Sequence, residues 1–196
     1  MLSALIACVG IMQSPKLFTK LVPPDQNFDE RIFHFRFWLY GEWVDVVVDD
    51  RLPFYSDGVS NLKEKAYAKL YGSYENLDAG QTYDALVDMS GGVPECIDLK
   101  QMSFKEKTNF WNILKQSFDK GSIISCSINA DNYTREAVQY NGLVKGHAYA
   151  VTNLMIVEDR YENVKKLIRI RNPWGNNVEW RGAWCDNLKV RRNGIA

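Results

Sequence analysis

The 196-residue sequence lacks a charge excess and a long hydrophobic run. Lys and Arg number 24, as do Asp and Glu, so the formal net charge is 0. Without a basic excess, nucleic acid and anionic membrane surfaces are not expected partners. The apolar opening MLSALIACVGIM is shorter than the roughly 18–20 residues of a membrane span, and it has no basic segment typical of a signal peptide. The sequence therefore predicts no stable membrane insertion.

Closely spaced cysteines are also absent. The four cysteines are Cys8, Cys96, Cys126 and Cys185, and none forms a C-x-x-C pair. Neither a zinc site nor a disulfide framework is expected from cysteines so far apart in a chain of this length. Widely spaced cysteines without a disulfide framework suit a reducing compartment, so we expect a cytoplasmic protein.

The order of the predicted elements indicates an α+β protein of two lobes. Apolar spacing predicts helices at the amino terminus, around residues 62–74, 83–88 and 107–120, and a β-hairpin over residues 32–48. Pro15 is expected to end the first helix. Strand patterns dominate after residue 120. We place the first lobe at residues 1–79 and the second at residues 80–196, with a polar linker over residues 76–82 between them.

One of the only two histidines, His147, begins a strand pattern that a second strand follows. A turn centred between residues 159 and 160 would pair residue 147 with residue 172, which is Asn172. Directly opposed side chains share one face of a hairpin. An asparagine that orients a histidine is part of the Cys-His-Asn triad of cysteine proteases. The hypothesis depends on the register, because a slip of one residue would separate the two side chains.

The same residues also allow a purely structural interpretation. A histidine at the start of a strand can be an ordinary core residue, and NPWG is a competent turn sequence. Pro173 would keep Asn172 extended, and Trp174 could cover the contact between the histidine and the asparagine. His34 alternates with aromatic residues in the first hairpin, so we expect it to face solvent and assign it no role.

No cysteine has the setting that activates a nucleophile, which is the N-terminus of a helix. Cys8 lies two turns into the first predicted helix, and Cys126 lies among isoleucines and is expected to be a core residue. Cys96 and Cys185 fall in predicted turns or loops. A nucleophilic serine is not indicated either, because no G-x-S-x-G stretch occurs.

Six stretches resemble the protease core of calpains, the intracellular calcium-activated papain-like cysteine endopeptidases: GEWVDVVVDDRLP, EKAYAKLYGSYENLDAG, ALVDMSGGVPECIDL, GSIISCSI, GLVKGHAYAVT and IRIRNPWGNNVEWRGAWCDN. The resemblance implies a two-lobed papain-like fold, with a helical first lobe and an antiparallel second lobe. It also implies that His147 is the catalytic imidazole, Asn172 its orienting partner and Trp174 the shielding ring. The family's nucleophile would lie just before Met1, so the resemblance implies a truncated, inactive core.

The resemblance further implies calcium as cofactor, with Glu179 and Asp186 as partial matches to ligands of the second lobe. The segment over residues 56–63 and the tail after residue 187 depart from the family pattern. The leading hypothesis is a calcium-dependent cysteine endopeptidase that performs limited proteolysis of intracellular proteins, with regulatory domains or a subunit outside this chain. A non-catalytic regulatory module of calpain type and a truncated product without function are the alternatives.

Overall fold

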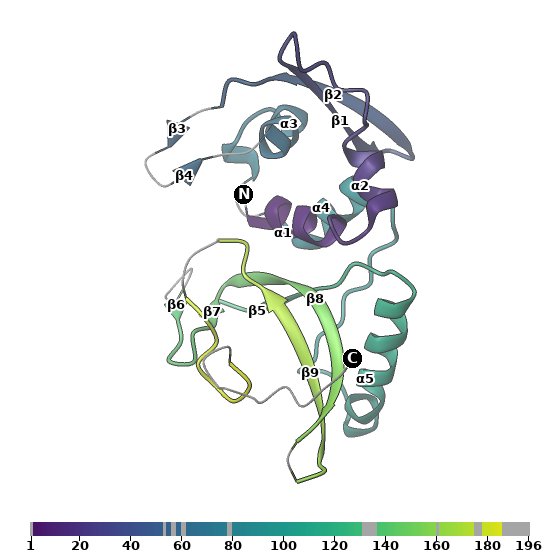
Figure 1. Ribbon diagram of the computed structural model, residues 1–196, viewed down its shortest axis with the longest axis vertical. Coiled ribbons are helices and arrows are strands. Elements are labelled where there is room, and N and C mark those ends of the chain that lie inside the picture. The colour runs from purple at the N-terminus through teal and green to yellow at the C-terminus, as the bar shows by residue number, and fades with distance from the viewer. Residues whose placement is uncertain are drawn as a thin grey trace.

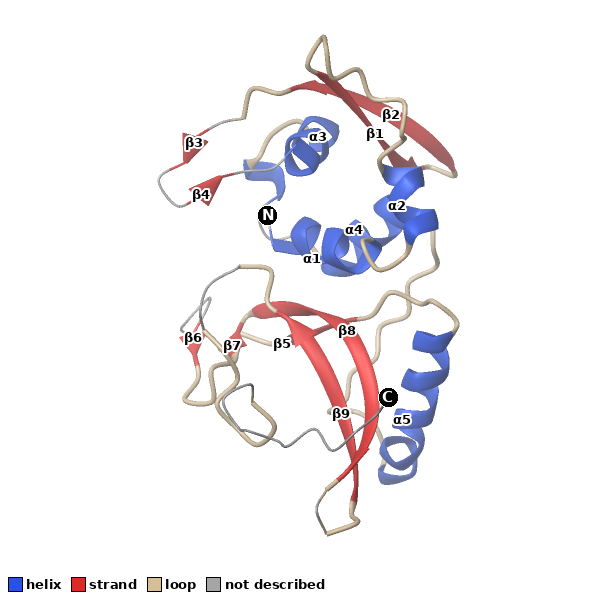
Figure 2. Ribbon diagram, viewed as in Figure 1, coloured by secondary structure: helices blue, strands red, loops and turns tan. Residues whose placement is uncertain are grey.

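The computed structural model describes residues 2–52, 54–55, 58–59, 62–77, 80–130, 137–159, 161–174 and 178–185. Its elements gather into a helix-rich group, with the first hairpin, and a sheet-rich group (Figures 1 and 2). The helices are α1 (Leu2–Ile11), α2 (Pro15–Leu21), α3 (Leu62–Tyr71), the 3-10 turn η1 (Glu75–Leu77), α4 (Thr82–Ser90) and α5 (Phe104–Asp119). The strands are β1 (Ile32–Leu39), β2 (Glu42–Asp49), β3 (Phe54–Tyr55), β4 (Gly58–Val59), β5 (Ser125–Ile128), β6 (Ala137–Val138), β7 (Val144–Lys145), β8 (His147–Glu158) and β9 (Val164–Arg171). The α+β class predicted from the sequence is confirmed.

Helix α1 lies between the two groups (Figure 1). One side places Ala7, Cys8 and Ile11 in the larger core cluster. The other side packs Ile6 against Ala148 and Ala150 of β8. A helix that is apolar on opposite sides is buried on both, and this accounts for the continuous apolar sequence of α1.

Strands β1 and β2 form the predicted hairpin, paired from Ile32 with Asp49 to Leu39 with Glu42. Tyr40 and Gly41 form its two-residue turn, and both have positive φ values, of 50° and 91°. Positive φ at both central residues suits the right-handed twist of a hairpin. Because strand residues alternate between faces, Phe35 and Phe37 enter the core while His34 and Arg36 lie on the other face.

One sequence-based boundary differs in the structure. Pro15 does not end α1; it is the first residue of α2, where its missing N–H costs no helical hydrogen bond. Helix α4 follows the predicted lobe boundary at residues 79 and 80, yet its Ala85 and Met89 belong to the core cluster that α1 and the hairpin share. The division of the chain stays a prediction, but the packing of α4 favours a crossing between the lobes after Ser90.

The second group contains α5, the short β6-β7 pair and a three-stranded antiparallel sheet in the order β5-β8-β9. Helix α5 begins three residues earlier than expected because Ser103 and Glu106 form a capping box. It lies beside the sheet (Figure 1), with the Lys166 ammonium of β9 over the Trp111 ring. The sheet carries the residues of interest at the end where β8 begins.

Candidate active site

His147 is the first residue of β8, where it pairs with Ile128 of β5. The preceding Gly146 has a positive φ of 70°, and its N–H donates to the Ile128 carbonyl oxygen at 2.7 Å. Glycine adopts this backbone conformation without steric cost, so the chain turns sharply into the strand. The His147 side chain is 1% exposed.

Asn172 contacts this imidazole directly. The His147 Nε2 and Asn172 Oδ1 atoms lie 2.8 Å apart. The backbone N–H of Trp174 donates to the same Oδ1 at 3.0 Å, which marks that atom as an acceptor. A neutral imidazole must then donate from Nε2, and its Nδ1 carries the lone pair. The site therefore favours the tautomer that can take a proton at Nδ1.

The predicted contact is present, but the register predicted for it is wrong. Ala150 pairs with Arg171, so the ladder ends before it could place residue 147 opposite residue 172. The turn is centred later than expected, since Asp159 bonds to Asn163, and the register shifts between Val151 and Asn153. Asn172 instead follows the last paired residue of β9, and its side chain spans the remaining distance.

Trp174 covers the contact as expected. Its ring centroid lies 4.3 Å from that of His147, with 55° between the ring planes. Trp174 is 38% exposed, so it forms the outer wall of the site. Excluding water strengthens a hydrogen bond between neutral groups. The arrangement thus has a buried imidazole, an orienting amide and an aromatic cover.

Comparison with known proteins identifies the family of this chain. Residues 2–192 match the family model described as calpain family cysteine protease. This chain belongs to the calpain family. It is 48% identical to calpain clp-1 of Caenorhabditis elegans over 96% of this chain and 26% of that protein. It is 45% identical to the calpain-2 catalytic subunit of Mus musculus and 41% identical to calpain-B of Drosophila melanogaster, each over 93% of this chain and over 28% and 21% of those proteins. The chain thus spans about a quarter of the length of these calpains.

The cysteines of this calpain-family chain are poorly placed to serve His147. Cys8 is buried, its thiol lies 3.8 Å from the Met89 sulfur, and burial raises its pKa to about 11. Cys126 is exposed, so the expectation that it is a core residue is wrong. It pairs with Tyr149 across the strands, which makes it a diagonal neighbour of His147, about 7–8 Å away. Cys96 and Cys185 lie outside the helices and strands.

The described residues do not assemble a calcium site. Glu179 is exposed, and its backbone oxygen packs against Gly142, where an added Cβ would lie 2.1 Å from that oxygen. Asp186, the other predicted ligand, lies outside the described residues. Within the described part of the chain, no three His, Cys, Asp or Glu side chains form a metal-binding group. Calcium needs about six to eight oxygen ligands, so Glu179 alone does not provide a site.

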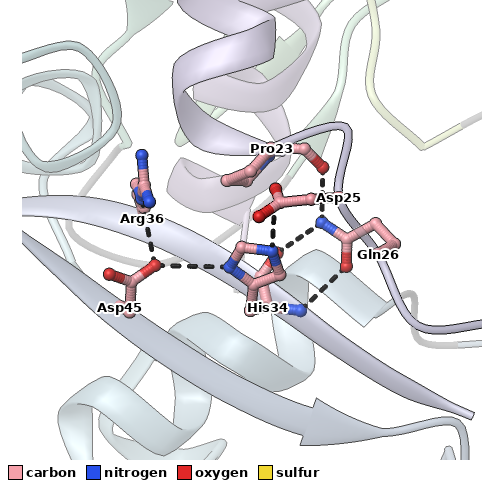
Figure 3. A network of polar contacts seen from close by, with 6 residues as sticks. All are labelled: Pro23, Asp25, Gln26, His34, Arg36 and Asp45. Carbon is pink, nitrogen blue, oxygen red and sulfur yellow. Dashed lines mark hydrogen bonds and ion pairs between the residues drawn. The ribbon is translucent and has the colours of Figure 1, made fainter. Parts of the chain in front are cut away.

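His34, to which the sequence assigned no role, lies on the hairpin face away from the core, as expected, and is half-buried there. Figure 3 shows its ring between Asp25 and Asp45, with each ring nitrogen 3.3 Å from a carboxylate oxygen. Its backbone N–H and carbonyl bond to the Gln26 side chain. Arg36 also binds Asp45, and this hydrogen bond, more than that of His34, lowers the pKa of the Asp45 carboxyl. In the sequence, the opposite charges of Arg36 and Asp45, which pair across the hairpin, were the signal that could have indicated this polar network.

Membrane insertion was not expected from the sequence. Among the helices that the structure describes, none has both the length and the apolar character needed to cross a bilayer.

Proposed function

We propose that this chain is the part of a cysteine endopeptidase core that carries the histidine and asparagine. The supporting observation is the 2.8 Å contact between His147 Nε2 and Asn172 Oδ1 beneath Trp174. In a chain of the calpain family, this is the arrangement that a thiol nucleophile requires of its base. The substrates would be intracellular proteins cleaved at a limited number of peptide bonds.

The reaction follows from the proposed tautomer. His147 Nδ1 takes the thiol proton, and the sulfur attacks the carbonyl carbon of the scissile bond. The bond between that carbon and the amide nitrogen breaks, and the imidazolium returns the proton to the leaving amine. Water then attacks the thioester, with His147 again accepting a proton, which releases the acid product and restores the thiol.

The nucleophile in this proposal is a cysteine that precedes Met1 in a longer product. Cys8 is excluded as the nucleophile because its thiol is buried and stays protonated, and none of the four cysteines lies at the N-terminus of a described helix. A chain of these 196 residues would therefore be inactive alone. Regulatory domains or a partner subunit would lie outside it.

Calcium dependence is proposed from the family relationship alone. Of the two predicted ligands, the structure describes only Glu179. Comparing the full-length product in calcium and in chelator tests this part of the proposal separately from the proteolysis itself.

Hydrolysis of a quenched-fluorescence peptide by the full-length product tests the proposal. We expect turnover that is lost in His147→Ala and retained in His34→Ala. A full-length product that has serine, lysine or glycine at the nucleophile position, and that binds the peptide without cleaving it, would contradict the proposal. That outcome would identify the chain as part of a non-catalytic regulatory module.

A further inference from the structure

Tyr149 lies two residues after His147 on β8, and it is 4% exposed. Residues two apart on a strand face the same side. The two rings accordingly meet edge to face, with centroids 4.9 Å apart and planes at 80°. This geometry is favourable for aromatic pairs because the positive edge of one ring meets the negative face of the other.

The Tyr149 hydroxyl connects the strand to the segment that leads into it. The Val144 N–H on β7 donates to this oxygen at 2.8 Å in a buried position. Between the two residues lies Gly146, the positive-φ residue that directs the chain toward His147. Burial raises the pKa of the Tyr149 phenol, so the oxygen accepts this bond as a neutral hydroxyl. The Tyr149 ring therefore contacts His147 at the end of this turn, and the Tyr149 hydroxyl binds Val144 at its start.

The imidazole is enclosed by aromatic rings as well as by the amide. Trp174 and Tyr149 both pack on it, at centroid distances of 4.3 and 4.9 Å. A half-turn of the imidazole about χ2 would exchange Nε2 with Cε1, so that Asn172 would face a carbon. The hydrogen bond to Asn172 is one constraint against this rotation, and the packed rings are another.

We infer that Tyr149 is a positioning residue for the endopeptidase reaction. Its ring keeps the His147 imidazole in the orientation in which Nε2 meets Asn172, and its hydroxyl fixes the turn from Val144 to Gly146. The catalytic part of this inference rests on the proposed function, whereas the orientation of the ring does not. Tyr149 acts through His147 and takes no proton itself.

Nitrogen NMR of the 196-residue chain tests the inference, because the imidazole 15N shifts report which ring nitrogen carries the proton. The chain has two histidines, so His34 serves as the internal reference. The variants are Tyr149→Leu, which removes the ring, and Tyr149→Phe, which removes only the hydroxyl. Tyr140→Leu is the matched control, because Tyr140 is 91% exposed.

In the unmodified chain and in Tyr140→Leu we expect His147 as the Nε2–H tautomer alone. Tyr149→Leu should give a mixture of tautomers with broadened His147 signals and unchanged His34 signals. Tyr149→Phe should keep the single tautomer and speed Val144 amide exchange by about fivefold to tenfold, the value of one hydrogen bond. If Tyr149→Leu does not fold, as judged by the His34 signals, Tyr149→Met is measured by the same criterion.

A single, unchanged His147 tautomer in Tyr149→Leu or Tyr149→Met overturns the inference. In the longer, cysteine-bearing product, Tyr149→Leu should lower kcat by about 10- to 100-fold with KM unchanged, since small misplacements of a catalytic group have effects of this size. If that product is inactive while the NMR results hold, the proposed function fails and the positioning of His147 by Tyr149 stands.

Discussion

His34 and His147 lie in regions of opposite chemical character. His34 lies between two carboxylates on the outer face of the hairpin, and its side chain is 20% exposed. His147 is buried, and its described partners are an amide and two aromatic rings. Carboxylates lie against both ring nitrogens of His34, whereas a neutral amide orients the His147 ring through Nε2. The second environment is the one that the proposed triad requires.

Replacing each histidine by alanine should give the largest contrast between the two regions. In the full-length product, His147→Ala should lower kcat on the order of 10⁶-fold, as the loss of a triad histidine does in serine proteases. His34→Ala should leave kcat unchanged. Rates measured with a quenched-fluorescence peptide check both values, and comparable losses in the two variants would remove the distinction.

Substitutions on the buried face of the hairpin should instead have a large effect on the free energy of unfolding. Phe37 lies on the hairpin face opposite His34 and is 0% exposed. Phe37→Ala should lower the free energy of unfolding by about 3–5 kcal/mol, since it leaves a cavity in the core. Urea denaturation of the chain measures this, with Tyr40→Ala in the exposed turn as the control. A loss below about 1 kcal/mol would show that the core does not depend on this strand in the way described.

Asn172→Ala should separate orientation from proton transfer in the His147 region. We expect kcat of the full-length product to fall about 10²-fold, less than the roughly 10⁴-fold that follows loss of the charged aspartate in serine proteases, because the asparagine amide is neutral. KM should change little. Asn112→Ala, on the exposed side of α5, is the matched control. A loss as large as that of His147→Ala would mean that Asn172 does more than orient the ring.

The smallest expected effect concerns acid stability near His34. Hydrogen bonds from Arg36 and His34 lower the pKa of Asp45. A lowered pKa in the folded state stabilises the fold above the unfolded pKa, about 3.9 for aspartate, and this stabilisation is lost as the pH falls below it. Asp45→Asn should therefore weaken the fold at pH 7 by less than about 1 kcal/mol, as is usual for exposed ion pairs.

Thermal unfolding of Asp45→Asn from pH 7 down to pH 2 checks that difference. The variant and the unmodified chain should converge in stability at the acidic end. A difference that grows as the pH falls would have the wrong sign for this explanation.

Local residue patterns predicted most of the helices and strands. They did not predict the register in which distant segments pair. Alternation of Phe33, Phe35 and Phe37 with polar residues predicted the first hairpin, because burial of one face fixes its register. The contact between His147 and Asn172 was predicted although the pairing assumed for it was wrong. The true register depends on the Asp159–Asn163 turn and on the irregularity after Val151, and neither has a clear sequence signature.

The partners of the two histidines were harder to predict than their strands. The Tyr149 ring reaches His147 from within the same strand, and its hydroxyl reaches back to Val144. The His34 ring contacts Asp25 from a loop outside the hairpin. Such contacts depend on side-chain rotamers and loop paths, which residue patterns do not encode. The two sets of partners nevertheless decide what each histidine can do.

The most direct test of the account is to identify the residue that a peptidyl epoxide alkylates in the full-length product. We predict, by mass spectrometry, a single modified cysteine that precedes α1, with labelling abolished in His147→Ala and preserved in His34→Ala. Modification of Cys8, Cys96, Cys126 or Cys185 in its place, or labelling that does not depend on His147, would contradict the account.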